Sequence, residues 1–219
     1  TMKRIIKILL VIISVCNLYA SGSKDSAQHD KPVFAVSILP QTYFVSQIAG
    51  DTVTVLVLVG EGQSPHSYEP TPLQIANLSR ASVWVLSGTD FEVSFQKKVS
   101  SQFPSIKIVD GTKGIKLREL NEWEIEADEH HDEEEDDHAA ADIQALRVDK
   151  HTWLGKENAK IMASHIYKSL VDLNPAQQDF YTENYTLLIR SIDETFTVLH
   201  TQLDNLHGRS ILVFHPSFG

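Results

Sequence analysis

The chain has only one cysteine among its 219 residues, Cys16, which lies near the N-terminus. Without a second thiol the chain cannot close an internal disulfide, and it cannot build a zinc site from several cysteine ligands. The apolar fraction of 42% is ordinary for a globular protein. A chain of this length can therefore bury a core without needing disulfide bonds.

Excess basic charge is also missing, since the formal net charge is −10. Nine of the 29 acidic residues fall within residues 126–137, a segment that contains no lysine or arginine. The other 20 acidic residues are almost balanced by 19 basic ones. No basic patch is available to neutralise phosphates, which argues against nucleic acid as a partner.

Residues 1–20 have the pattern of a signal peptide, with a basic start, an apolar stretch too short for a membrane helix, and a small, polar end. Cleavage near Ala20 would discard Cys16. Alternatively, Ile13-Ser14-Val15-Cys16 is a loose lipoprotein cleavage box, in which Cys16 would carry a lipid anchor. We therefore expect a protein that is periplasmic or anchored to the outer face of the cytoplasmic membrane.

Strand-like runs alternate with helical patterns after a small, polar tether at residues 21–32. The pattern predicts helices over 43–49, after Thr71-Pro72, and after Asp90, which we expect to cap the third of them. The predicted strands lie at 33–38, 53–59, 83–86 and 106–109. This alternation predicts an α/β fold, with a mostly parallel sheet covered by helices. We assign this lobe to residues 33–155.

The second half of the chain is predicted to be helical over residues 156–208. One helix covers 156–171, and apolar residues at helical spacing predict a long helix over 175–206. A strand-like run follows at 210–214, and a strand needs neighbours with which to pair. We therefore interpret residues 209–219 as the start of a second, missing α/β lobe, and the chain as a fragment or a truncated product.

Three histidines lie far apart in the chain, each inside a short loop motif. They are His66 in Ser-Pro-His-Ser-Tyr-Glu-Pro, His151 in Asp-Lys-His-Thr-Trp-Leu, and His215 in Phe-His-Pro-Ser-Phe-Gly. Three imidazoles and one oxygen donor would form a tetrahedral Zn²⁺ site, and imidazole favours zinc over manganese. We predict that these histidines bind one zinc ion, although an isolated loop histidine is usually only solvated or hydrogen-bonded.

Two carboxylates lie close to these histidines in the sequence. Glu69 and Asp149 could accept hydrogen bonds from the ligating imidazoles and orient them. The alternative for Glu69 is a solvated residue ahead of the next helix.

The acidic segment at residues 126–142 cannot bury apolar surface, and we predict that it is a loop. It contains His130, His131 and His138, which favour a second, weaker zinc site over the alternative of a solvated run of charge.

The histidine motifs carry a family resemblance. Residues 62–72, 87–92, 149–154 and 214–219 resemble the zinc-specific substrate-binding proteins of bacterial metal ABC importers, with a His- and acid-rich insert between the second and third stretches. The resemblance implies two α/β lobes joined by one long helix, with zinc held between them by His66, His151 and His215. A carboxylate from the second lobe or a water would be the fourth ligand. The chain departs from the family by having Lys150 where proline is common, and by lacking a tyrosine after Gly219.

The resemblance also implies a function. We expect a monomeric, non-enzymatic protein that captures Zn²⁺ and delivers it to an ABC permease in the inner membrane. The alternatives are a non-functional truncated fragment, a metal-binding surface adhesin and a zinc-dependent hydrolase. No His-Glu-x-x-His motif and no obvious general base support the hydrolase.

Overall fold

The computed structural model describes residues 31–121, 148–210 and 213. The predicted signal peptide at 1–20, most of the predicted tether, and the predicted loop at 126–142 lie outside the described residues, as does His215. Residues from Pro32 onward form one unit. No helix among the described residues is both long enough and apolar enough to span a bilayer.

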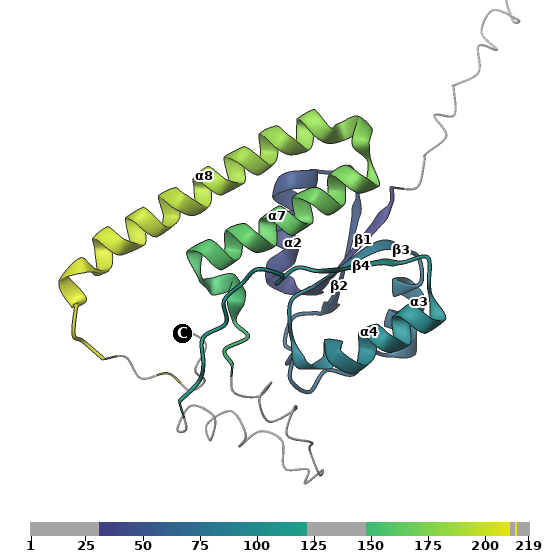
Figure 1. Cartoon of the computed structure of the whole chain (residues 1–219), viewed down its shortest axis with the longest axis horizontal. Helices are drawn as coiled ribbons and strands as arrows, with labels where there is room; N and C mark the ends of the chain where they lie inside the picture. The colour runs from purple at the N-terminus through teal and green to yellow at the C-terminus, as the bar shows by residue number, and fades with distance from the viewer. Residues whose placement is uncertain (1–30, 122–147, 211–212, 214–219) are drawn as a thin grey trace, which may run out of the picture. The chain divides into compact units, whose positions relative to one another are not determined.

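Four parallel strands form the sheet, which is drawn at the centre of Figure 1. In spatial order they are β2 (Thr54–Val59), β1 (Val33–Ile38), β3 (Ala81–Leu86) and β4 (Lys107–Asp110). The parallel sheet with its connecting helices confirms the α/β fold that the sequence predicted.

Helices cover both faces of this sheet (Figure 1). Side chains alternate along a strand, so Phe34 and Val36 pack on one face of β1 while Ala35 packs on the other. The first face is covered by α2 (Leu39–Ala49), α7 (Lys156–Leu173) and α8 (Gln178–Leu203), and the second by α3 (Pro72–Leu78) and α4 (Asp90–Gln102). Burial on both faces explains why β1, β2 and β3 are mostly apolar, whereas the edge strand β4 begins and ends with exposed charged residues.

The start of α3 follows the expected cap, whereas α2 begins four residues earlier than the sequence predicted. Thr71 Oγ1 accepts the backbone N–H of Gln74, and the Gln74 side chain accepts the N–H of Thr71. In α2, Pro40 lies in the first turn, where a missing N–H costs no helical hydrogen bond. Buried Gln41 accepts the N–H groups of Ser37 and Ile38, so a side chain inside the helix satisfies the donors before it.

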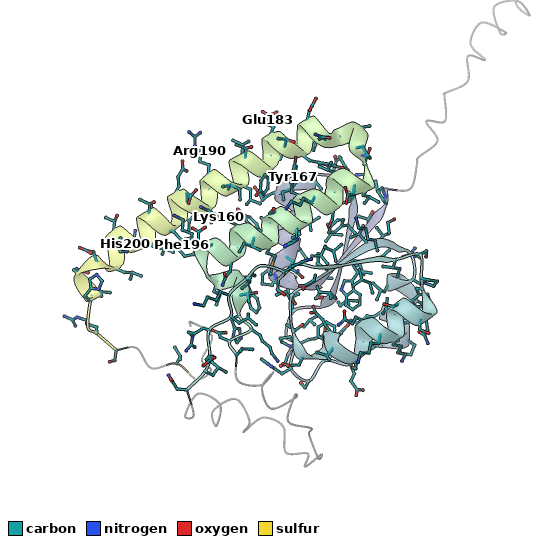
Figure 2. The ribbon with its side chains drawn as sticks, viewed as in Figure 1. Lys160, Tyr167, Glu183, Arg190, Phe196 and His200 are labelled. Atoms are coloured by element: carbon teal, nitrogen blue, oxygen red, sulfur yellow. The ribbon has the colours of Figure 1, made fainter. Side chains whose placement is uncertain are left out.

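The two C-terminal helices agree closely with the predicted spans. Between them lies a 3₁₀ turn at Pro175–Gln177, and α8 continues into another at Asp204–Leu206. The rings of Tyr167 on α7 and Tyr185 on α8 stack with centroids 4.6 Å apart. Figure 2 shows Glu183 and Arg190 pointing away from α7. Both helices therefore share the core of the sheet, while the outward side of α8 exposes Leu187, Val198 and Leu203 as well as charged residues.

Candidate metal centre

The loop between β2 and α3 carries His66. Its backbone N–H donates to Ser64 Oγ at 3.3 Å. Two residues further on, Tyr68 is buried, and its ring meets that of Phe91 edge-on with centroids 4.9 Å apart. Contacts on both sides of His66 thus fix the loop beyond the carboxyl end of β2, where ligands of open α/β sheets bind.

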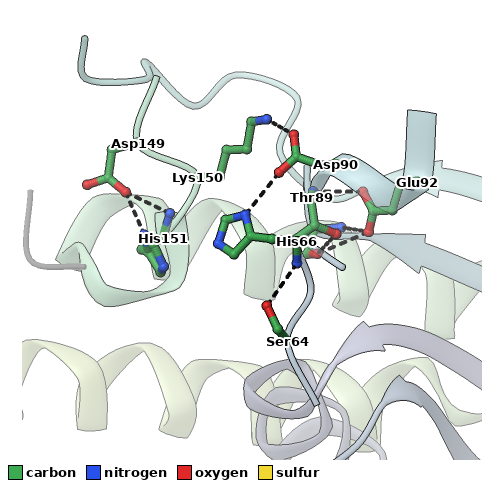
Figure 3. A network of polar contacts seen from close by, with 9 residues as sticks. Ser64, His66, Thr89, Asp90, Glu92, Asp149, Lys150 and His151 are labelled. Carbon is green, nitrogen blue, oxygen red and sulfur yellow. Dashed lines mark hydrogen bonds and ion pairs between the residues drawn. The ribbon is translucent and has the colours of Figure 1, made fainter. Parts of the chain in front are cut away.

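The imidazole of His66 contacts Asp90, the first residue of α4. Nδ1 of His66 lies 3.2 Å from Oδ2 of Asp90, and the other carboxylate oxygen of Asp90 pairs with Lys150 (Figure 3). The sequence offered Glu69 for the orienting role, but Glu69 is exposed and it is Asp90 that meets Nδ1. Nothing in the spacing of residues 66 and 90 signals this contact, because it depends on how β2 and β3 lie in the sheet.

A different carboxylate, that of Glu92, satisfies the backbone just before α4. Glu92 accepts the backbone N–H groups of Ser87, Gly88 and Thr89 at 2.7, 2.7 and 3.2 Å. The expectation that Asp90 caps this helix is therefore wrong: Thr89 occupies the cap position and Glu92 satisfies its N–H. Gly88 allows the turn because its φ is +82°, in the left-handed region.

A second carboxylate holds His151. Oδ1 of Asp149 accepts from both the backbone N and Nδ1 of His151, each at 2.9 Å. Its other oxygen lies 3.6 Å from the Arg118 guanidinium, and the backbone N–H of Asp149 donates to the Arg118 carbonyl. The Asp149 side chain is only 8% exposed. Asp149 therefore makes the hydrogen bond that its predicted orienting role requires, and the role itself stays a prediction.

The two imidazoles lie near each other although they are 85 positions apart in the chain. Their ring centroids are 6.2 Å apart with the planes inclined at 56°. Two imidazoles on one tetrahedral zinc, with Zn–N bonds of about 2.0–2.1 Å, would have centroids about 5 Å apart. Small side-chain rotations would close that difference. With a carboxylate at each Nδ1, the proton is placed there and the lone pair falls on Nε2, the usual arrangement of a metal-binding histidine.

The other predicted ligands do not complete a site within the part of the chain that the structure describes. His215 lies outside the described residues, as do His130, His131 and His138 of the acidic loop. Among the residues that are described, no group of three His, Cys, Asp or Glu side chains is arranged to hold a metal ion. The structure therefore brings together two of the three predicted histidines, His66 and His151.

The groups around the two histidines keep the Asp90 carboxylate ionised. Burial on its own would raise the pKa of Asp90, but the hydrogen bonds to His66 and Lys150 outweigh burial and lower it. The neighbouring phenol behaves differently, because burial raises the pKa of Tyr68 to about 12. Tyr68 is thus neutral at physiological pH and is a packing residue rather than an anionic ligand.

Comparisons with known proteins identify the family of the chain. The family described as zinc-uptake complex component A, periplasmic, matches residues 35–219. The chain belongs to this family. Its members are substrate-binding components of uptake systems and not enzymes, which argues against the hydrolase alternative.

Individual relatives differ in the metal that their names give. The chain is 28% identical to the high-affinity zinc uptake system protein ZnuA of Bacillus subtilis, over 98% of this chain and 65% of that protein. It is 29% identical to the manganese ABC transporter substrate-binding lipoprotein PsaA of Streptococcus pneumoniae, over 88% of this chain and 60% of that protein. A crystal structure of ZnuA superposes with a TM-score of 0.71 at 32% identity, covering 87% of this chain and 66% of that one. The chain thus spans less than two thirds of the length of each of these relatives.

Proposed function

We propose that this protein captures Zn²⁺ outside the cytoplasmic membrane and delivers it to an ABC permease. Zinc is the cargo, bound through Nε2 of His66 and His151. The third ligand is His215, and an oxygen donor, either a carboxylate or a water, is the fourth. The observation that carries the proposal is the pair of imidazoles at 6.2 Å, each with a carboxylate at Nδ1.

The donor set favours zinc over manganese. Manganese prefers carboxylate oxygens, whereas imidazole nitrogens suit zinc. Both carboxylates beside the imidazoles already have partners, because Asp90 pairs with Lys150 and Asp149 with Arg118. Family membership supports metal capture in general, while relatives named for manganese make the choice of metal a matter for direct measurement.

Family membership supports the proposed delivery route and the proposed location of the protein. A periplasmic component of an uptake complex must release its metal to a membrane permease, and a signal peptide at residues 1–20 would place it there. A lipid anchor at Cys16 and a monomeric state are part of this proposal.

Substitution of the paired histidines tests the proposal. We expect His66→Ala and His151→Ala each to weaken zinc binding by more than the roughly 10–100-fold that loss of an outer partner costs. His200→Ala on α8 is the matched control, because His200 is exposed and lies on α8, outside both histidine motifs (Figure 2). Titration of each variant with Zn²⁺ and Mn²⁺ against a chelator of known affinity gives the result. Wild-type zinc affinity in His66→Ala, or tighter binding of Mn²⁺ than of Zn²⁺ by the wild type, would contradict it.

The acidic loop has a separate test. We propose that His130, His131 and His138 collect zinc weakly, in addition to the main site. Deletion of residues 126–138 should lower the number of weakly bound zinc ions and leave the tight site unchanged. An unchanged stoichiometry in equilibrium dialysis would rule this role out.

A further inference from the structure

Asp90 joins two segments that lie far apart in the chain. One carboxylate oxygen meets Nδ1 of His66, and the other meets Nζ of Lys150, the residue directly before His151. Lys150 and Asp90 are 60 positions apart, and the Lys150 side chain is only 14% exposed. A lysine ammonium is seldom so well covered unless it is paired, so this contact fixes where the Lys150 side chain goes.

The backbone around Lys150 is held on both sides. Asp149 is anchored to Arg118 through its carboxylate and its backbone N–H, and it also accepts the N–H of His151. An antiparallel bridge between Glu119 and Val148 leads the chain into this segment. The Lys150–Asp90 contact links this segment to the imidazole of His66, because Asp90 contacts both side chains.

Other ion pairs in the described regions lack this arrangement. Lys107 pairs with Asp172 at 2.7 Å between β4 and α7, but both side chains are more than half exposed and no imidazole shares the carboxylate. Lys160 pairs with Asp193 at 2.6 Å between α7 and α8, again away from any histidine. The Asp90 carboxylate differs from both because it is shared between a cation on one histidine segment and the imidazole of the other.

We propose that Lys150 is a positioning residue for the metal site: through Asp90 it ties the segment that carries His151 to the imidazole of His66. The inference rests on the proposed zinc site. The tie holds the two imidazoles as a pair before the metal arrives, so less conformational freedom remains to be lost when zinc binds. Without it, the two loops would be ordered at the moment of binding, at a cost in affinity.

The main variant is Lys150→Met, which keeps the length of the side chain and removes its charge. We expect zinc to bind about tenfold more weakly, at the lower end of the roughly 10–100-fold range for outer partners, because the pair is partly exposed. Calorimetry should show the loss as a less favourable binding entropy. Lys150→Arg retains the cation and should restore binding to within about threefold of the wild type. Lys107→Met, which breaks the exposed pair with Asp172, should have no effect.

A double-mutant cycle separates this role from a general effect on stability. In an Asp90→Ala background the tie is already broken, so adding Lys150→Met should cause no further loss of zinc affinity. The double variant removes both the Asp90 carboxylate and the Lys150 ammonium, so neither charge is left behind without its partner. It can therefore be measured even if Lys150→Met alone does not fold. Wild-type affinity in Lys150→Met or in the double variant would overturn the inference, as would fully additive losses. If His66→Ala also left zinc affinity unchanged, the proposed zinc site itself would be wrong. If Lys150→Met left zinc affinity unchanged but His66→Ala weakened it, the zinc site would stand and only the role of Lys150 would be wrong.

Discussion

The two imidazoles of the candidate site are held alike, but by carboxylates from very different distances along the chain. Asp149 is two residues from His151, accepts two hydrogen bonds from it, and is almost completely buried. Asp90 is 24 residues from His66, makes one contact with it, and is 31% exposed. A local pair needs only a turn of the backbone, whereas a distant pair needs the sheet, the cap of α4 and the turn at Gly88 to form first.

The largest effect on stability should come from Glu92, which holds the turn that places Asp90 beside His66. Glu92→Ala removes the acceptor for three backbone N–H groups, and each one left buried without a partner costs about 1–3 kcal/mol. Because water can reach part of this turn, we expect a total loss of about 2–4 kcal/mol in the free energy of unfolding, measured by urea denaturation. A loss below about 1 kcal/mol would show that the turn at Ser87 to Thr89 forms without Glu92.

Glu92 should also make the free energy of unfolding depend on pH. Burial raises the pKa of Glu92 above its ordinary value of 4.5, and its hydrogen bonds offset this only in part. The folded state then favours the protonated form, so this contribution to stability is fully present below pH 4.5 and is lost as pH rises through the folded pKa. The difference in unfolding free energy between wild type and Glu92→Gln should therefore fall as pH rises above 4.5. A difference that does not change with pH would contradict the shift.

A direct comparison of the two carboxylates comes next in size. Asp149→Ala should weaken zinc binding by close to 100-fold, and Asp90→Ala by about tenfold, since the range for such outer partners is roughly 10–100-fold. The order follows from burial and from the number of hydrogen bonds lost. Chelator competition on the two variants decides it. Equal losses would mean that burial and the number of hydrogen bonds do not decide how firmly a carboxylate holds its imidazole.

The turn that precedes Asp90 should show a smaller effect. Gly88→Ala places a Cβ at a φ of +82°, 3.0 Å from Cγ2 of Thr112. We expect a loss of about 1–2 kcal/mol in unfolding free energy, from backbone strain and the close contact. Gly114→Ala is a matched control at a φ of +97° with nothing within 4 Å, so it carries strain alone. Equal losses in thermal or urea melts would assign the whole effect to the backbone.

The smallest effect should lie away from the site, between α7 and α8. Hydrogen bonds from Lys156 and then Lys160 lower the pKa of Asp193 below 3.8. This stabilisation is present above pH 3.8 and is lost as pH falls through the folded pKa. Asp193→Asn should therefore lower the melting temperature only slightly at neutral pH, and less in high salt, because exposed ion pairs contribute little. A large drop that persists in salt would mean that the cluster has a stronger structural role.

The sequence predicted features that depend on neighbours in the chain. Alternating strands and helices gave the parallel sheet, Thr71-Pro72 marked the start of α3, and Asp149 lay beside His151. The sequence predicts Asp90 as the cap of its own helix, because aspartate at the start of a helix is a common N-cap residue. Its real contact, with His66, depends on strand order and cannot be obtained from spacing. The early start of α2 was missed for a similar reason, since the side chain of Gln41 replaces an ordinary cap.

The position of Trp153 beside His151 should make its fluorescence sensitive to metal binding. Its ring meets that of His151 edge-on with centroids 5.3 Å apart, and it packs against the cores on both faces of the sheet. An imidazole that acquires a divalent cation changes the electric field at the adjacent indole, and the emission of that indole should shift. Trp84 is fully buried against Phe95, so its emission should stay constant. Trp153 is thus an intrinsic optical reporter at one of the two imidazoles, and in a Trp123→Phe background it would report arrival of the metal without any label.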